Sequence, residues 1–189
     1  MRVIAGEYRS RPLQSLPGMD VRPTSDRLRE TLFNVLASGD PEALRGTVWL
    51  DLYAGTGAVG IEAISRGAGK VYFVESSLKT VALIEKNLSS LGIAKGFEVL
   101  RGEVESALRR LSTQEFKADV IFLDPPYRMR EAYASTLEAL GKSPLVGGST
   151  RVVAEHEKKF DPGEEFGKLV RYRKLVQGDA GLSFYGVTV

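Results

Sequence analysis

Apolar residues follow two different periodicities along the chain from Trp49 onward. Short continuous runs rich in β-branched and aromatic residues are typical of buried strands, whereas apolar residues spaced three and four positions apart indicate helices. On this basis strands are predicted at 48–50, 71–75, 97–100, 119–123, 151–156, 169–176 and 182–188, and helices at 59–64, 79–91, 104–111 and 131–140. Strands that alternate with helices predict an α/β fold with a mostly parallel sheet covered on both faces.

The two ends of the chain depart from this alternation. No helix separates the last two predicted strands, so we expect an antiparallel C-terminal hairpin at the edge of the sheet. At the N-terminus, residues 3–13 contain Gly6 and Pro12 and predict a small β-hairpin. Pro23-Thr24-Ser25-Asp26 then offers N-cap chemistry ahead of an amphipathic helix that ends near Ser38-Gly39. We therefore expect an N-terminal extension over residues 1–40 and one α/β domain over residues 41–189.

A glycine-rich turn joins the first of these strands to the helix that follows it. Gly55, Gly57 and Gly60 stand in a G-x-G-x-x-G register, and Glu75 ends the next strand. Glycines let the backbone bend tightly and approach a ligand, while an acid in that place can accept hydrogen bonds from ribose hydroxyls. Glu75 could equally be a solvated acid, but the strand–turn–helix context favours an adenosine-type cofactor. Dinucleotides and S-adenosylmethionine both have the required shape.

The residues that lead into the turn favour S-adenosylmethionine. The run Asp51-Leu52-Tyr53-Ala54-Gly55-Thr56-Gly57 resembles the first motif of class I methyltransferases. A pyrophosphate needs a helix N-terminus that points at it, whereas the methionyl ammonium favours an acid such as Asp51 nearby. Asp51 could instead cap the helix or simply end its strand.

The tetrad Asp124-Pro125-Pro126-Tyr127 follows the predicted strand 119–123 directly, at an edge where open α/β sheets bind ligands. An exocyclic amine on a base is a poor nucleophile because its lone pair is delocalised into the ring. The Asp124 side chain and the Pro125 carbonyl, which the prolines hold rigidly, can accept both amine hydrogens and draw the lone pair toward a methyl donor. Tyr127 offers a ring on which a flipped base can stack. Taken alone, the tetrad could be a strand-terminating turn.

Composition excludes several other chemistries. The 189 residues contain no cysteine, which rules out a disulfide scaffold, a cysteine nucleophile and a cysteine-based zinc site. No apolar run approaches the roughly 20 residues of a membrane-spanning helix, and residues 1–6 have no apolar stretch of signal-peptide length. We therefore expect a soluble cytoplasmic protein without a metal. His156 is the only histidine, and its place at the end of a predicted strand favours a partly exposed structural residue.

The formal net charge of +2 is unevenly distributed. Residues 1–29 carry six arginines against three acids, so the rest of the chain sums to −1. Arginine presents a planar fork suited to phosphates and base edges, which makes this arm a candidate contact for RNA or DNA. A second basic stretch, without any acid, spans residues 168–174. Both could equally be solvated surface.

The glycine turn and the tetrad together resemble the Asp/Asn-Pro-Pro-Tyr amino methyltransferases, which act on adenine N6, guanine N2 or glutamine amides. More specifically, the chain resembles the bacterial 16S ribosomal RNA guanine-N2 methyltransferase family. The resemblance lies in residues 2–6, 9–13, 22–34, 55–63, 124–127 and 185–188. The resemblance implies a class I, Rossmann-like methyltransferase that uses S-adenosylmethionine to modify one guanine of small-subunit rRNA. It implies as partners 16S rRNA in an assembly intermediate or assembled subunit, with ribosomal proteins nearby.

This resemblance assigns roles to individual residues. The implied catalytic residues are Asp124, which orients the amine, Pro125, Pro126 and Tyr127, which stacks on the base. The implied cofactor contacts are Asp51, Tyr53, Gly55, Gly57, Glu75 and Glu103, although the family usually has an aspartate where this chain has Glu103. The implied RNA contacts are Arg9, Arg11, Arg22, Arg27, Arg29, Arg128 and Arg130.

Other functions are compatible with the same motifs. An adenine-N6 methyltransferase acting on DNA shares both of them, but such enzymes generally carry a separate target-recognition domain. Protein glutamine methylation usually goes with asparagine in place of Asp124. A non-catalytic rRNA-binding assembly factor or a nucleotide-dependent oxidoreductase would also retain the glycine turn.

Overall fold

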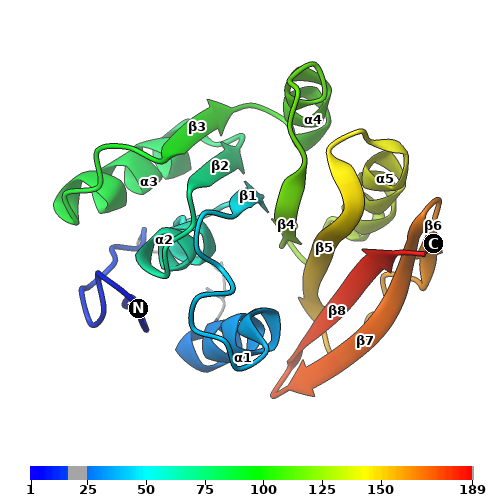
Figure 1. Cartoon of the computed structure of the whole chain (residues 1–189), viewed down its shortest axis with the longest axis horizontal. Coiled ribbons are helices and arrows are strands. Elements are labelled where there is room, and N and C mark those ends of the chain that lie inside the picture. Colours follow the sequence, from blue (N-terminus) through cyan, green and yellow to red (C-terminus); the bar gives the residue numbers. More distant parts are fainter. Residues whose placement is uncertain (17–24, 189) are drawn as a thin grey trace.

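A computed structural model of the protein describes residues 1–16 and 25–188. In this part of the chain, one eight-stranded sheet has the strand order β3-β2-β1-β4-β5-β8-β7-β6 (Figure 1). The strands are β1 (Val48–Leu52), β2 (Lys70–Glu75), β3 (Phe97–Arg101), β4 (Ala118–Leu123), β5 (Val146–Glu157), β6 (Glu165–Phe166), β7 (Leu169–Gln177) and β8 (Ala180–Val187). The helices are α1 (Asp26–Ala37), α2 (Ala58–Ser65), α3 (Leu78–Ser90), α4 (Val104–Leu111) and α5 (Arg130–Lys142).

The topology confirms the α/β fold expected from the two periodicities. Strands β3, β2, β1, β4 and β5 are parallel to one another, and β8, β7 and β6 extend the sheet by antiparallel pairing. The pattern misses β6, because two residues are too few to show a periodicity. It also starts β5 at residue 151 instead of Val146, because Gly147, Gly148 and Ser149 interrupt the apolar run where the β4–β5 register shifts.

Side chains alternate between the two faces of the sheet and pack there into two hydrophobic clusters. Trp49 and Phe122 belong to the cluster shared with α1, α2 and α3, whereas Leu50 and Leu123 belong to the cluster shared with α4 and α5. Figure 1 shows the helices divided in the same way between the two sides of the sheet. None of the helices in the described part of the chain is long and apolar enough to cross a membrane.

The N-terminal segment runs along α2 and shares its core. Val3 and Leu13 are buried in the cluster of α1, α2 and α3. The expected hairpin is reduced to an isolated bridge between Arg2 and Pro12 with a turn between them. Ser25 caps α1 through its side chain, which confirms the predicted start of this helix. Packing is continuous across residue 40, and a division of the chain there stays a prediction.

Candidate active site at the carboxyl edge of the sheet

The glycine turn and the tetrad meet at one edge of the sheet. β1 and β4 are adjacent and parallel, with Leu52 opposite Leu123, so the segments that follow them leave the sheet side by side. The backbone N–H of Asp124 donates to the Leu52 carbonyl at 3.4 Å and continues the pairing by one residue. The structure thus brings together the two motifs that the sequence predicts as one site.

Neighbouring backbone and side-chain groups hold the glycine turn in place. The Gly55 N–H donates to Glu75 Oε2 at 3.0 Å, and Glu75 Oε1 accepts from the Ser77 N–H at 2.9 Å. Gly55 and Gly57 adopt left-handed backbone angles (φ 55° and 77°), a conformation that favours glycine. The predicted acid at the end of β2 therefore orders the turn itself.

Asp51 lies near the end of β1, on the face that α2 covers, and is buried. Its Oδ2 accepts the Gly60 N–H at 2.9 Å, so this carboxyl stabilises the first turn of α2. Burial is the main cause that raises the pKa of Asp51 to about 8. The hydrogen bond from Gly60 lowers this pKa in part, and the charge of Glu75 raises it further. A cationic ligand group beside Asp51 would favour its ionised form.

The groups around the turn fit S-adenosylmethionine. A Cβ built on Gly55 would meet only the Tyr53 carbonyl within 4 Å, at 3.9 Å, so space beside the turn is open. Asp51 offers an acid for the methionyl ammonium, because only its Oδ2 is needed for the hydrogen bond from the Gly60 N–H. Each Glu75 oxygen accepts one backbone N–H and keeps a lone pair for a ribose hydroxyl.

Three acids line this edge on one face of the sheet. β4 and β5 pair with Leu123 opposite Ala154, which sets Asp124 next to Glu155, and Asp51 follows on β1. The sequence pattern does not single out Glu155, because an acid inside an apolar strand forms no motif; it is 3% exposed. Burial, then the charges of Glu155 and Asp51, raise the pKa of Asp124 well above its usual value. Among the described residues, no group of acids and histidines is arranged to hold a metal ion.

The tetrad leaves β4 with its two functional side chains accessible. Asp124 and Tyr127 are partly exposed, Pro126 is exposed and Pro125 is buried. The hydroxyl of Tyr133, from α5, donates to the Pro125 carbonyl at 3.3 Å. This carbonyl is the second acceptor that the sequence predicts for the target amine, and no motif points to its tyrosine partner.

Tyr53 and Glu103 lie at the same edge of the sheet but differ in what they contact. The Tyr53 Oη shares a hydrogen bond with Thr136 Oγ1 at 2.8 Å, so this side chain is directed toward α5. Glu103 is exposed at the N-terminus of α4. It follows Gly102, whose N–H donates to the Glu75 carbonyl at 3.0 Å. Contacts of Tyr53 and Glu103 with a cofactor stay predictions.

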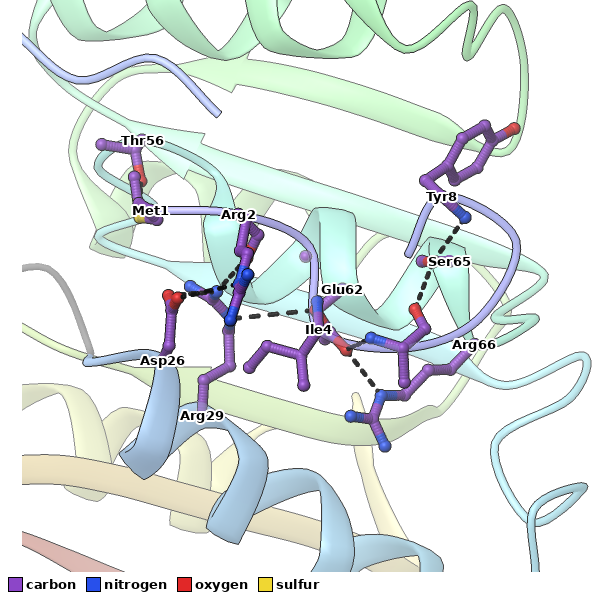
Figure 2. Close-up of polar contacts among 12 residues, drawn as sticks. Met1, Arg2, Ile4, Tyr8, Asp26, Arg29, Thr56, Glu62, Ser65 and Arg66 are labelled. Atoms are coloured by element: carbon purple, nitrogen blue, oxygen red, sulfur yellow. Dashed lines mark hydrogen bonds and ion pairs between the residues drawn. The ribbon is translucent and has the colours of Figure 1, made fainter. Parts of the chain in front are cut away.

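Two buried side chains attach the N-terminal segment to this site. Asn87 Nδ2 donates to the Thr56 and Gln14 carbonyls at 3.0 and 3.1 Å. The Glu62 carboxylate, on α2, accepts the backbone N–H groups of residues 4–5 at 2.8 and 3.0 Å (Figure 2). The sequence offers one signal for both, a polar residue on the apolar face of a helix, and we did not predict either.

Arg29 departs most clearly from the predicted RNA contacts. Its side chain is 0% exposed and lies between α1 and the N-terminal segment (Figure 2). The guanidinium donates to the Arg2 carbonyl and to Asp26 Oδ1, and its Nε lies 3.8 Å from Glu62 Oε2. The prediction that Arg29 binds RNA is wrong, because a buried guanidinium paired with acids cannot reach a phosphate. Arg22, another predicted contact, lies outside the described residues.

Arg9 and Arg11 lie away from the glycine turn. The Tyr8 N–H donates to Ser65 Oγ at 3.0 Å at the C-terminal end of α2, and Arg11 donates to the Ser90 carbonyl at 3.2 Å at the end of α3. Both helices begin at the carboxyl edge of the sheet and run back from it. The structure therefore does not bring these arginines to the tetrad, and contacts with a remote part of an RNA stay a prediction.

Of the other arginines predicted to bind RNA, Arg128 and Arg130 follow the tetrad in the chain, and Arg27 lies on α1. Arg27 is exposed in the first turn of α1, and Arg128 is exposed directly after the tetrad. Arg130 is exposed as well, but it lies 3.5 Å from Glu157 and over the ring of Phe160. Contacts of these three arginines with RNA stay predictions.

The second basic stretch is largely engaged within the fold. Lys168 Nζ donates to two backbone carbonyls at 2.8 Å. Arg171 and Lys174 pair with Asp161 at 2.5 and 2.8 Å. Arg173 is exposed. The stretch therefore braces β7 more than it forms a free basic surface.

His156 is fully buried, so its expected partial exposure is wrong. Its Nε2 shares a hydrogen bond with Ser183 Oγ at 2.9 Å, and its Nδ1 lies 2.8 Å from the Glu157 carbonyl. A Cβ on Gly181 would lie 2.6 Å from the ring, so β8 crosses the histidine at close range. Burial lowers the pKa of His156 and keeps the ring neutral near pH 7. These contacts give His156 the structural role expected from the sequence.

A parallel sheet with an antiparallel C-terminal extension, and a glycine turn beside a tetrad at its carboxyl edge, define a class I methyltransferase fold. The model of one family, described as "Conserved hypothetical protein 95", matches residues 1–186, and the chain belongs to this family. Together with the relatives described next, this match confirms the resemblance to the bacterial 16S ribosomal RNA methyltransferase family.

Named relatives and solved structures agree with this assignment. "Putative rRNA methyltransferase YlbH" of Bacillus subtilis is 35% identical over 98% of both chains. "Ribosomal RNA small subunit methyltransferase D" of Escherichia coli is 34% identical over 83% of this chain and 75% of its own length. The structure of hypothetical protein TTHA0928 from Thermus thermophilus superposes with a TM-score of 0.82 at 29% identity and covers 99% of both chains.

A more distant structure shares the fold alone. It is an RNA methyltransferase from Salinibacter ruber in complex with S-adenosyl-L-homocysteine, 19% identical, with a TM-score of 0.62 over 87% of this chain and 93% of its own.

Proposed function

We propose that this protein transfers a methyl group from S-adenosylmethionine to the exocyclic N2 of one guanine in 16S ribosomal RNA. That it is an S-adenosylmethionine-dependent rRNA methyltransferase follows from its family. The small-subunit RNA is a finer proposal, supported by relatives such as the small subunit methyltransferase 34% identical to this chain. The guanine N2 target rests on the family resemblance of the sequence motifs. The observation that carries it is the adjacency of the glycine turn and Asp124-Pro125 at the ends of β1 and β4.

The tetrad supplies positioning and electrostatics. Bound S-adenosylmethionine would supply the methyl group. The Asp124 carboxylate and the Pro125 carbonyl accept the two amine hydrogens, so that the nitrogen lone pair is turned out of conjugation toward the donor. Asp124, whose pKa is raised, is then suited to receive the proton that the amine loses. Tyr127 stacks on the extruded base, which contributes about 1–3 kcal/mol.

The substrate is 16S rRNA within an assembly intermediate or an assembled small subunit in the cytoplasm, with ribosomal proteins near the site. Arg128, exposed directly after the tetrad, and Arg27, exposed at the start of α1, bind phosphates around the extruded nucleotide, and Arg130 assists at the β5 side. Residues 1–40 act as an extension that combines cofactor and RNA contacts. With a net charge of only +2, the affinity comes from a local footprint more than from a broad basic surface.

The decisive experiment incubates the protein with labelled S-adenosylmethionine and small subunits lacking the modification, then identifies the methylated nucleoside by mass spectrometry. We expect N2-methylguanosine in 16S rRNA. N6-methyladenosine would overturn the substrate assignment. RNA binding without any methylation would point to an assembly factor, and tighter binding of NAD(P)H than of S-adenosylmethionine would overturn the cofactor.

The matched variant is Asp124→Ala. Loss of the acceptor is expected to abolish methylation, because one amine hydrogen then has no partner, while binding of the small subunit stays within about twofold of the wild type. Glu138→Gln, an exposed substitution on α5, is the control and should retain full activity.

A further inference from the structure

We propose that Tyr133 is a positioning residue for methyl transfer: its hydroxyl fixes the direction of the Pro125 carbonyl, the second acceptor for the target amine. The proposal rests on the proposed function, since it concerns the acceptor pair of that reaction. Tyr133 lies on α5, outside the tetrad, and donates to the Pro125 carbonyl at 3.3 Å.

The Pro125 carbonyl needs such a partner because of the residues around it. It belongs to the peptide plane between Pro125 and Pro126, and that plane has no N–H, since its nitrogen lies in the Pro126 ring. A residue before proline is confined to ψ of roughly 120–160°, which narrows the direction of the carbonyl but does not set it. Within the range that the two prolines allow, the direction of this plane is set by whatever bonds the carbonyl oxygen itself.

The backbone hydrogen bonds of the turn leave this plane free. The Asp124 N–H donates to β1 at 3.4 Å, before the plane, and the Met129 N–H donates to the Pro126 carbonyl at 2.7 Å, after it. Within the described residues, the hydrogen bond that the Pro125 carbonyl accepts comes from Tyr133. This side chain therefore holds a peptide plane of the turn that neither of these two backbone hydrogen bonds reaches.

Tyr133 is built to keep a fixed place. Its side chain is 1% exposed and packs against Phe160, with ring centroids 5.0 Å apart. Phe160 in turn contacts the buried ring of His156, so the tyrosine is supported from β5 and from the segment that follows it. Burial and, to a lesser degree, the charge of Asp124 raise the pKa of Tyr133. The hydroxyl therefore keeps its proton and stays a donor.

The carbonyl oxygen can accept from Tyr133 and from the substrate amine at once. A carbonyl oxygen has two lone pairs, so one can accept from Tyr133 while the other accepts from the amine. The 3.3 Å distance is long for a hydroxyl donor, as is common for hydrogen bonds of an active site before its substrate arrives. Misplacement of a reacting group by about 1 Å can cost on the order of a hundredfold in rate, so a small swing of this carbonyl matters.

The test compares two tyrosines that make the same kind of bond. Tyr185 is also fully buried, and its hydroxyl donates to the Gly163 carbonyl at 2.8 Å in a loop outside the tetrad. Tyr133→Phe and Tyr185→Phe each remove a hydroxyl that donates to one carbonyl, and the Tyr185 hydroxyl also contacts Ser183 and Arg171. We expect kcat of Tyr133→Phe to fall by about tenfold, with KM for S-adenosylmethionine and for the small subunit unchanged, and kcat of Tyr185→Phe to stay within about twofold.

Thermal midpoints separate positioning from stability. We expect both phenylalanine variants to lose a similar number of degrees, so an equal loss of kcat in both would overturn the proposal, as would full activity of Tyr133→Phe. If wild-type protein methylates no rRNA amine, the proposed function fails first; if it does and the two variants behave alike, this inference alone fails.

Discussion

Asp51 shows how one buried carboxyl can serve both the fold and the cofactor. It holds the first turn of α2 through the Gly60 N–H, and burial raises its pKa to about 8. Near pH 7 the folded protein therefore retains a proton that the unfolded chain has already released. An ammonium group beside Asp51 reverses this balance, because it stabilises the ionised form.

Binding of S-adenosylmethionine is therefore expected to release a proton. At pH 7 the cofactor's ammonium ionises Asp51, so affinity should weaken as the pH falls below about 8. Titration calorimetry at pH 7 in buffers of different ionisation enthalpy measures the release directly. Asp51→Asn should bind the cofactor more weakly and release no proton; equal proton release in both proteins would contradict this role.

The stability of the cofactor-free protein should depend on the same group. Because the folded-state pKa of Asp51 is raised, its unfavourable contribution is absent below the unfolded-state value near 4 and grows as the pH rises toward 8. Asp51→Asn is expected to raise the midpoint of thermal unfolding relative to wild type more at pH 8 than at pH 5. A difference that is the same at both pH values would show that Asp51 ionises freely in the folded protein.

Asp124 and Glu155 form the second acidic feature of the site. Asp124 must be ionised to accept an amine hydrogen, so its raised pKa places the acidic limb of the pH–rate profile above the usual range for an aspartate. Glu155→Gln removes the neighbouring negative charge and should move this limb to lower pH, although burial, the larger cause, persists. Profiles of kcat/KM for wild type, Glu155→Gln and the control Glu138→Gln test this. An unmoved limb would show that Glu155 does not influence Asp124.

Helix α2 owes its place to an ionic cluster with the N-terminal segment. Glu62 is fully buried, accepts from the backbone of residues 4–5 and from Arg66 Nε at 2.8 Å, and faces the buried Arg29 (Figure 2). The same helix begins at the glycine turn. A segment that looked like an arginine-rich arm is thereby part of the support of the cofactor turn.

Removal of the Glu62 charge should be costly. In Glu62→Gln the buried guanidinium of Arg29 loses one of its two acidic partners, and breaking a buried pair in this way costs about 3 kcal/mol of unfolding free energy. Denaturant titration measures the loss. Glu42→Gln, which breaks an exposed ion pair with Arg45, is the control and should leave stability unchanged. A loss equal to that of the control would show that the cluster contributes nothing.

The molecule as a whole separates its cationic groups into two populations. Arg27 and Arg128 are exposed, whereas Arg29 is buried against acids and Arg171 and Lys174 of β7 pair with Asp161 at the surface. Arg9 and Arg11 lie farther along α2 and α3. The footprint on RNA should therefore centre on the tetrad.

Arg128→Gln is expected to lower kcat/KM for the small subunit several-fold and to reduce the slope of log affinity against log salt by about one, as the loss of one phosphate contact requires. Arg9→Gln should have a smaller effect on kcat/KM. The control is Arg109→Gln on α4, exposed and paired with Glu105. At fixed salt, we expect the loss of kcat/KM to be largest for Arg128→Gln, smaller for Arg9→Gln and smallest for Arg109→Gln. The reverse order would refute an RNA footprint centred on the tetrad.

The alternation of periodicities was sufficient to predict the fold class, nearly every element and the meeting of two motifs at one edge. The reason is physical: buried strands and amphipathic helices have local signatures, and parallel strands necessarily present their carboxyl ends together. Spacing and residue type likewise placed Asp51, Glu75 and Asp124 at this edge, since each directly follows or ends an apolar strand, and their roles toward cofactor and substrate stay predictions.

Only the tertiary structure decided which residues of different helices and strands contact one another. Arg29 and His156 look accessible in a one-dimensional pattern and are buried, because segments distant in sequence cover them. Glu155, Tyr133 and Glu62 take their importance from neighbours on other elements, and a partner that lies across a sheet or between helices leaves no local spacing to read. Local chemistry therefore sets what each residue can do, and packing sets which of them do it together.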